Sequence, residues 1–167
     1  MSITNKTRIR TLISALPGVH LREIQRILGL SFSSVRYNVD TLKKTKQVLD
    51  RTENGRSRLF PPNLEFRDMI VYSHLRNRSS RKILREFVQK EKLTNGELSA
   101  LTGYAKSTRS ECVHRLREAE ILTTSFALDG RVAYRLKDPE HLIPMVRAAD
   151  RTVFEEATNR FIQLWDF

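Results

Sequence analysis

The sequence predicts a mainly α-helical protein with two small β-hairpins and a C-terminal helical segment. Three observations lead to this fold class. Apolar residues recur at helical spacing between prolines and glycines, an Asn-Gly and an Asp-Gly pair each lie between short apolar runs, and the pattern repeats after 74 residues. The chain has 167 residues, of which 40% are hydrophobic, and this suffices for one or two small domains.

Three short helices are predicted at the start of the chain, separated by Pro17-Gly18 and by Gly29. The third is expected over residues 32–46. Their inward-facing residues are, in chain order, Ile9, Leu12, Ile13 and Leu16, then Leu21, Ile24, Ile27 and Leu28, then Val35, Val39 and Leu42. Three short helices with a tight turn before the last are typical of a helix-turn-helix.

A β-hairpin is predicted directly after the third helix. Asn54-Gly55 lies between residues 48–51 and 58–60, and this pair favours a type I′ turn because both central residues must accept a positive φ. A hairpin at this place is a wing, so residues 1–62 are predicted to form a winged helix-turn-helix domain. A connecting helix is expected over residues 63–78, with Asn63 as its N-cap.

The same order of elements recurs in residues 79–138, which predicts a second winged helix-turn-helix domain in tandem with the first. Ser79 and Ser80 can cap its first helix, and the capping box Thr94-x-x-Glu97 opens its second. The residues that this second helix is expected to turn inward are Leu98 and Leu101.

A third helix is expected over residues 106–120, after a turn at Gly103, and Asp129-Gly130 marks the turn of the second hairpin. The two third helices differ in detail. A shift of 74 residues matches Val35 with Arg109, and Tyr37 with Glu111. The expected core of this helix consists of Cys112, Val113 and Leu116.

Residues 139–167 are predicted to form C-terminal helices. Asp138-Pro139 supplies the N-cap and first residue of a helix that Pro144 limits, and Asp150 can cap the next helix. The second helix carries an apolar stripe that either packs on the chain's own second domain or, as we prefer, joins two copies of the chain as a homodimer. This candidate dimer interface consists of Phe154, Ala157, Phe161, Leu164 and Trp165.

The charge is unevenly distributed. The net charge of +11 divides into +8 over residues 1–63, +5 over residues 64–138 and −2 over residues 139–167. So large a positive charge on a short chain indicates a polyanionic partner, with nucleic acid favoured over an acidic membrane surface.

Several classes of protein are excluded by the sequence. The single cysteine, Cys112, cannot form an internal disulfide, which predicts an intracellular, cytoplasmic protein, and no apolar run reaches the roughly 18 residues of a membrane span. The four histidines lie on separate elements, and no phosphate loop or hydrolase motif is present. We therefore expect no enzymatic activity, metal, cofactor or membrane partner. Cys112 is expected in the core, with a redox switch as the alternative.

The first unit resembles a known family. The segments Pro17-Gly18-Val19-His20-Leu21-Arg22-Glu23-Ile24, Gly29-Leu30-Ser31 and Ser34-Val35-Arg36-Tyr37-Asn38-Val39 are similar to archaeal tandem winged helix-turn-helix transcriptional regulators of the ArsR/MarR-like type. The resemblance covers residues 5–138 in architecture and is close in motif over the first unit. It implies a third helix in the DNA major groove and a wing on the backbone or minor groove.

The residue types of the first unit suit this role, because Arg and Asn can read base edges and Lys can contact phosphate. The candidate DNA-binding residues are Ser33, Ser34, Arg36, Tyr37, Asn38, Lys43, Lys44, Arg56 and Arg58. In the second unit, Glu111, Glu118 and Glu120 dilute the positive charge, so the surface there is a candidate for either DNA or a protein partner. It consists of Lys106, Ser107, Arg109, Ser110, His114 and Arg131.

The sequence thus predicts a regulator that binds a specific site on double-stranded DNA, with the first domain as the main reader. The alternative is an adaptor of the transcription machinery, in which the first domain binds DNA and the second recruits a basal transcription factor or an RNA polymerase subunit. Binding to RNA, or to chromatin without sequence preference, is a third and weaker hypothesis.

Overall fold

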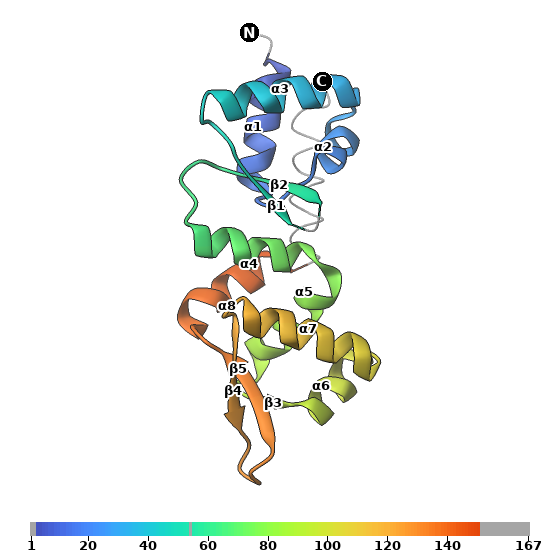
Figure 1. Cartoon of the computed structure of the whole chain (residues 1–167), viewed down its shortest axis with the longest axis vertical. Coiled ribbons are helices and arrows are strands. Elements are labelled where there is room, and N and C mark those ends of the chain that lie inside the picture. Colours follow the sequence, from blue (N-terminus) through green and yellow to red (C-terminus); the bar gives the residue numbers. More distant parts are fainter. Residues whose placement is uncertain (1–2, 54, 151–167) are drawn as a thin grey trace. The chain divides into compact units, whose positions relative to one another are not determined.

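The computed structural model describes residues 3–53 and 55–150, which divide into two compact units. One unit covers the described residues up to Ser73, and the other begins at His74. The described residues form eight helices and two small antiparallel sheets (Figure 1), an architecture compatible with a winged helix. None of these helices combines the length and the apolar character that a membrane crossing requires.

The first unit begins with three helices, α1 (Asn5–Ala15), α2 (Leu21–Leu28) and α3 (Phe32–Lys44), which confirm the three predicted helices. The hydroxyl of Ser31 caps α3 by accepting a hydrogen bond from the Ser34 N–H at 3.2 Å. The helix ends two residues earlier than predicted, because Lys46 has a φ of +55° and leaves the helical conformation. The buried core joins the three helices to the hairpin through Ile9, Leu12, Ile13, Leu16, Val19, Ile24, Leu28, Val35, Val39, Leu42, Val48 and Leu59.

The predicted hairpin is confirmed as β1 (Leu49–Glu53) and β2 (Arg56–Phe60). Glu53 faces Arg56 in the antiparallel register, so a two-residue turn joins the strands, and Gly55 has the positive φ of +72° that this turn requires. On the other side of β2, Val19 forms a bridge to Leu59. The segment that precedes α2 is thereby fixed to the hairpin.

The predicted connecting helix is α4 (Phe66–Arg76), but the expected N-cap at Asn63 is wrong. The Leu64 N–H bonds to the Pro61 carbonyl at 3.4 Å, which makes a turn of this segment. The first helical hydrogen bond runs from the Met69 N–H to the Glu65 carbonyl at 3.1 Å.

The second unit contains α5 (Arg78–Gln89), α6 (Asn95–Thr102) and α7 (Lys106–Glu118). The predicted caps Ser79 and Ser80 are wrong for α5, because Asn77 Oδ1 accepts from both of their backbone N–H groups at 3.1 Å. Ser80 is instead buried. The cap therefore lies two residues before the first serine of the pair.

The capping box that opens α6 is confirmed, since Glu97 and Thr94 bond reciprocally. Leu98 is fully buried as predicted, but Leu101 is 42% exposed, so its inward placement is wrong. The buried place one turn after Leu98 belongs to Thr102, whose hydroxyl donates to the Leu98 carbonyl at 2.6 Å. The hydroxyl can be buried because it is satisfied within the helix.

A three-stranded sheet completes the second unit, in the order β3-β5-β4. The predicted hairpin is confirmed as β4 (Leu122–Phe126) and β5 (Val132–Leu136), whereas β3 (Leu93–Thr94) was not predicted. Two residues are too short for an alternating pattern to be visible in the sequence.

The last described helix, α8 (Pro139–Ala148), begins at the predicted Asp138-Pro139 but is not limited by Pro144. Proline removes only the hydrogen bond to the carbonyl of Glu140, and that residue is exposed. Burial of Leu142 and Val146 holds the helix on both sides of the proline. The predicted following helix, with Phe154, Ala157, Phe161, Leu164 and Trp165, lies outside the described residues.

The two units agree in their element bounds after a shift of 74 residues. This shift carries α2 onto α6 and α3 onto α7 at both ends. It also pairs Gly29 with Gly103, both left-handed, and the non-glycine residues Lys46 and Glu120, whose φ angles are +55° and +57°. The turn before each third helix and the turn after it therefore have the same backbone conformation.

Candidate nucleic-acid interface

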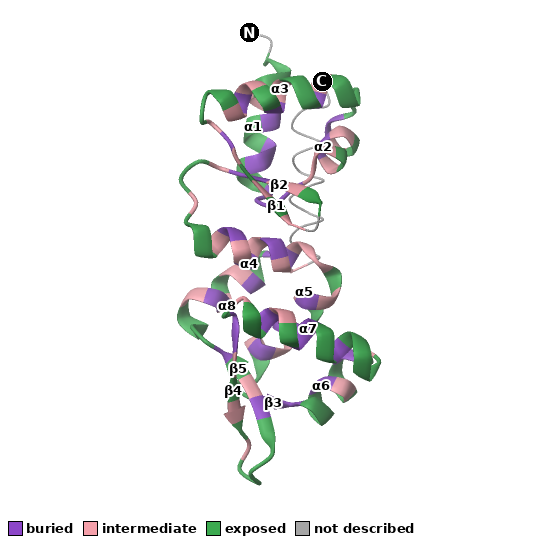
Figure 2. Cartoon of the chain, viewed as in Figure 1, coloured by how far each residue is buried: buried purple, intermediate pink, exposed green. Residues whose placement is uncertain are grey.

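The third helix of the first unit presents an open face. Its buried residues Val35, Val39 and Leu42 lie on one side. Ser33, Tyr37 and Lys44 are spaced by four and seven residues, so they share the opposite side. All three are exposed, Tyr37 by 73% of its surface. Figure 2 shows that exposed and buried residues alternate along α3.

Three polar side chains on and beside this face have no internal hydrogen-bond or ion-pair partner among the described residues. Arg36, Tyr37 and Lys44 are exposed, and their side chains make no hydrogen bond or ion pair within the described part of the chain. A guanidinium, a phenol and an ammonium group are therefore available to an external partner without the loss of an internal contact.

The carboxamide of Asn38 is held by its own helix. Its Nδ2 donates to the Ser34 carbonyl at 2.8 Å, and both residues are half-buried. Bidentate pairing with adenine uses both the donor and the acceptor of the amide. Asn38 would have to release the Ser34 carbonyl to read a base in this way.

Two predicted DNA-binding cations are bound within their own unit. Lys43 Nζ lies 2.7 Å from Asp50 Oδ2, and Arg58 Nη1 donates to the Gly18 carbonyl at 3.0 Å. Arg58 is also half-buried, so it acts as a structural link between β2 and the segment before α2. Arg56, next to the turn of the hairpin, is exposed.

One further pair extends the open face, and it was not among the predicted site residues. The guanidinium of Arg22 on α2 lies 5.6 Å from the ring centre of Phe32, which is 37% exposed at the start of α3. The signal in the sequence is an aromatic residue at the first helical position after the turn, where no apolar residue is needed for the core.

On the corresponding helix of the second unit, Lys106, Ser107, Ser110 and His114 are exposed. The structure corrects the prediction for Arg109, which is only 8% exposed and donates from Nη1 to the Tyr104 carbonyl at 3.0 Å. It occupies the position that Val35 has in the first unit, so its guanidinium is not part of the outer surface.

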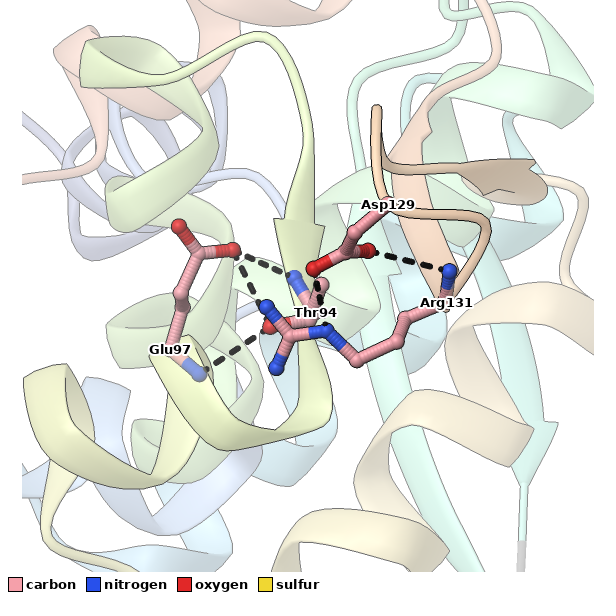
Figure 3. Close-up of polar contacts among 4 residues, drawn as sticks. All are labelled: Thr94, Glu97, Asp129 and Arg131. Atoms are coloured by element: carbon pink, nitrogen blue, oxygen red, sulfur yellow. Dashed lines mark hydrogen bonds and ion pairs between the residues drawn. The ribbon is translucent and has the colours of Figure 1, made fainter.

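The tip of the second hairpin is electrically balanced. Arg131 Nε lies 2.6 Å from Asp129 Oδ2, and the Arg131 N–H donates to Asp129 Oδ1 at 3.1 Å (Figure 3). These hydrogen bonds, led by that from the backbone, lower the pKa of Asp129. Arg131 is therefore a neutralised cation rather than a free one.

A second carboxylate lies beside this tip. Hydrogen bonds from the Thr94 N–H at 2.8 Å and from its hydroxyl at 3.1 Å lower the pKa of Glu97, with smaller contributions from Lys90 and Arg131. Figure 3 shows the Arg131 side chain between Asp129 and the Thr94–Glu97 pair. The hairpin β4–β5 therefore carries negative charge beside its turn at neutral pH.

One of the four histidines, His20, and the single cysteine, Cys112, have structural contacts. His20 Nδ1 lies 2.8 Å from the Ser57 carbonyl, and the Cys112 thiol is fully buried with its Sγ 3.4 Å from Ser80 Oγ. Residues 3–53 and 55–150 hold no group of three or more His, Cys, Asp or Glu side chains arranged to bind a metal ion.

Comparison with protein-family models and with curated proteins finds no match to this chain. The geometry of α3 and its hairpin is therefore the basis of the functional argument.

Proposed function

We propose that the protein is a transcriptional regulator that binds a specific site on double-stranded DNA through two tandem winged helix-turn-helix domains. In this proposal α3 enters the major groove, the hairpin β1–β2 contacts the backbone, and the first domain is the main reader. The chain acts in the cytoplasm without enzymatic activity.

The observation that carries the proposal is the open face of α3. Thirteen helical residues span about 20 Å, and the major groove, about 12 Å wide, admits one helix. Arg36, Tyr37 and Lys44 are exposed and unengaged on this helix, within the segment of charge +8. In this proposal the Arg36 guanidinium pairs with a base edge, the Tyr37 ring contacts a base, and Lys44 contacts a phosphate.

The tandem arrangement is supported by the agreement of the two units under one shift of 74 residues. Helix bounds, left-handed glycines and the positive φ after the third helix all coincide. Coincidence of the turns is stronger support than coincidence of apolar residues, because any amphipathic helix provides the latter.

Selection of bound sequences from a random double-stranded DNA pool, at two salt concentrations, tests the proposal. The expected result is a short enriched sequence motif whose affinity falls as the salt concentration rises. The salt dependence reports how many phosphates the protein contacts, and the enriched motif reports which bases it reads. Binding without an enriched motif would favour a nonspecific DNA-coating role. No binding at low salt would contradict the proposal.

An adaptor of the transcription machinery is the second candidate, favoured by the surface of the second unit. Arg109 is buried, Arg131 is paired with Asp129, and the wing exposes Phe126, Leu128 and Val132. An apolar, balanced surface suits a protein partner better than phosphate. Affinity capture with purified RNA polymerase and basal factors tests it, with Leu128→Lys expected to abolish capture and to leave DNA affinity unchanged.

A further inference from the structure

Helix α3 carries a fourth unpartnered side chain, a carboxylate, on its open face. Asp40 lies three residues after Tyr37 and four before Lys44, so it shares the side that is turned away from the core. It is exposed, and its side chain makes no hydrogen bond or ion pair within residues 3–53 and 55–150. Asp40 was not among the predicted site residues, because a carboxylate on its own does not suggest contact with a polyanion.

The lack of a partner sets Asp40 apart within its unit. Every other carboxylate in the described part of the first unit accepts a hydrogen bond or forms an ion pair. These carboxylates are Glu23, Asp50, Glu53, Glu65 and Asp68. The one carboxylate without an internal partner in this part of the chain is therefore on the proposed reading helix.

Two cations flank Asp40 on the same helix. Arg36 and Lys44 lie one turn before and one turn after it, at the four-residue spacing that commonly forms ion pairs in helices. Both are exposed, and neither is paired with Asp40. On α7, by contrast, Glu111 and Arg115 form an ion pair at this spacing, at 3.9 Å. The three charged groups of α3 are thus all available to one external partner.

The chemistry of the major groove restricts what Asp40 can contact in the proposed complex. Its carboxylate is repelled by the phosphates and by the acceptor atoms of guanine and thymine. The hydrogen-bond donors in this groove are the amino groups of cytosine and adenine. In adenine the amino group lies beside the acceptor N7, whereas cytosine presents its N4 amino group alone. Cytosine is therefore the base that a carboxylate fits best.

We propose that Asp40 is a specificity-determining residue that accepts a hydrogen bond from the N4 amino group of a cytosine in the binding site. The inference rests on the proposed function and deepens it by naming one base of the site. Asp40 lies about 6 Å along the helix axis from Arg36, which corresponds to about two base pairs at a rise of about 3.4 Å. The site should contain a cytosine at about this distance from the guanine that Arg36 reads.

Repulsion is part of this role. A carboxylate that faces phosphates lowers the affinity for every sequence, and only a base with a well-placed donor compensates for it. Asp40 thus separates the correct site from other sequences partly by weakening the binding to those others. Its removal should reduce discrimination rather than reduce binding in general.

Selection from a random double-stranded DNA pool, with the full chain and with two Asp40 variants, tests the inference. The wild type is expected to enrich a cytosine at one position of its motif. Asp40→Ala should lose the preference at that position and keep the rest of the motif. Asp40→Asn should shift the preference to adenine, because a carboxamide pairs with both N6 and N7. A residue that only supports the fold would not exchange one base for another.

Affinities for two duplexes give the magnitude. The wild type should prefer the selected site over a copy in which the C·G pair is T·A by at least about fivefold, the lower end of the usual cost of one wrong base pair. Asp40→Ala should bring this ratio to about one. Asp50→Asn is the matched control, because it removes the same charge from the same unit, where Asp50 lies 2.7 Å from Lys43. It should leave the motif and the ratio unchanged.

A wild-type motif that stays the same in both Asp40 variants would overturn the inference and leave the proposed function standing. So would a gain in affinity of Asp40→Ala that is equal for the two duplexes, since Asp40 would then act only by repelling phosphate. Binding by the wild type without any enriched motif would overturn both the inference and the proposed function. Thermal unfolding of the variants should match that of the wild type, because Asp40 is exposed and makes no internal contact that would be lost.

Discussion

The Nζ atom of Lys43 on α3 lies 2.7 Å from Oδ2 of Asp50 on β1. About a third of each side chain is exposed, so the pair is at the surface but not freely solvated. It joins the end of the proposed reading helix to the start of the wing. Lys43, which the sequence analysis predicted to contact phosphate, is thus already neutralised within its own unit. Asp50 also brings negative charge beside the proposed DNA face.

Asp50→Asn is expected to strengthen DNA binding for every sequence alike, because it releases Lys43 toward the phosphates. The slope of log affinity against log salt should steepen by roughly 1, the value for one further phosphate contact. The loss of folding stability should be at most about 1 kcal/mol, as for other surface ion pairs. Fluorescence anisotropy at several salt concentrations measures the slope, and an unchanged slope would exclude Lys43 from the interface.

Arg36→Ala is expected to weaken binding to the selected site by about 1–3 kcal/mol, the contribution of one good bidentate base contact. Binding to random DNA should change much less. Arg135→Ala, which removes an arginine of β5 that is also exposed, is the control and should leave both affinities unchanged. Equal losses on specific and random DNA would show that Arg36 contacts only phosphate.

Arg109→Leu is expected to raise the stability of the second unit by about 1 kcal/mol, because replacement of a buried charge by an apolar residue of similar volume is neutral or stabilising. Arg109 Nε is buried without a hydrogen-bond partner, which adds to the cost of the native residue. Urea unfolding measures the change. Arg109→Ala is the control and should destabilise, because it loses the same contact to Tyr104 as Arg109→Leu but also leaves a cavity that leucine fills.

Glu97→Gln is expected to reduce the pH dependence of stability. The hydrogen bonds from Thr94 lower the pKa of Glu97 below its ordinary value of 4.5, so the folded state binds this proton less readily than the unfolded state. The carboxylate stabilises the fold above pH 4.5, and this contribution disappears as the pH falls through the lowered pKa.

The free energies of unfolding of wild type and Glu97→Gln should therefore differ more at about pH 7 than at about pH 3. Urea unfolding at the two values gives the comparison, and taking the difference removes the titration of Asp129 and Glu120, which both proteins share. A difference that stays constant with pH would mean that the glutamate cap does not contribute through its charge.

Local signals in the sequence predicted most of the helices and both hairpins. Gly29, Gly103 and the Thr94–Glu97 box act within a few residues, so their effect is readable from the chain alone. The errors at Asn63 and Ser79 have a common cause: the competing cap-forming groups, at Glu65 and Asn77, lie only two residues away. The sequence shows which nearby residues are of a type that can cap a helix, but the packing of the helix determines where it begins and therefore which of them becomes the cap.

The candidate site was predictable in its elements but less so in its individual side chains. Exposure of Ser33, Tyr37 and Lys44 follows from helical spacing. The contacts of Lys43, Asn38 and Arg58 depend on which acceptor lies within reach after folding, and for Lys43 and Arg58 that acceptor is on another segment. Burial of Arg109 could have been inferred from its match to Val35, although a charged residue in the sequence favours an exposed placement.

The positive φ of Lys46 and Glu120 has a mechanical consequence. A residue with a side chain held in the left-handed conformation costs about 1 kcal/mol or more relative to a relaxed one, and both units retain this cost at the junction of third helix and wing. A fixed kink at that point leaves little freedom for the wing to swing against the helix. In the proposed complex with DNA, the angle between α3 and its hairpin would then be set by the backbone of the first unit rather than adjusted on contact.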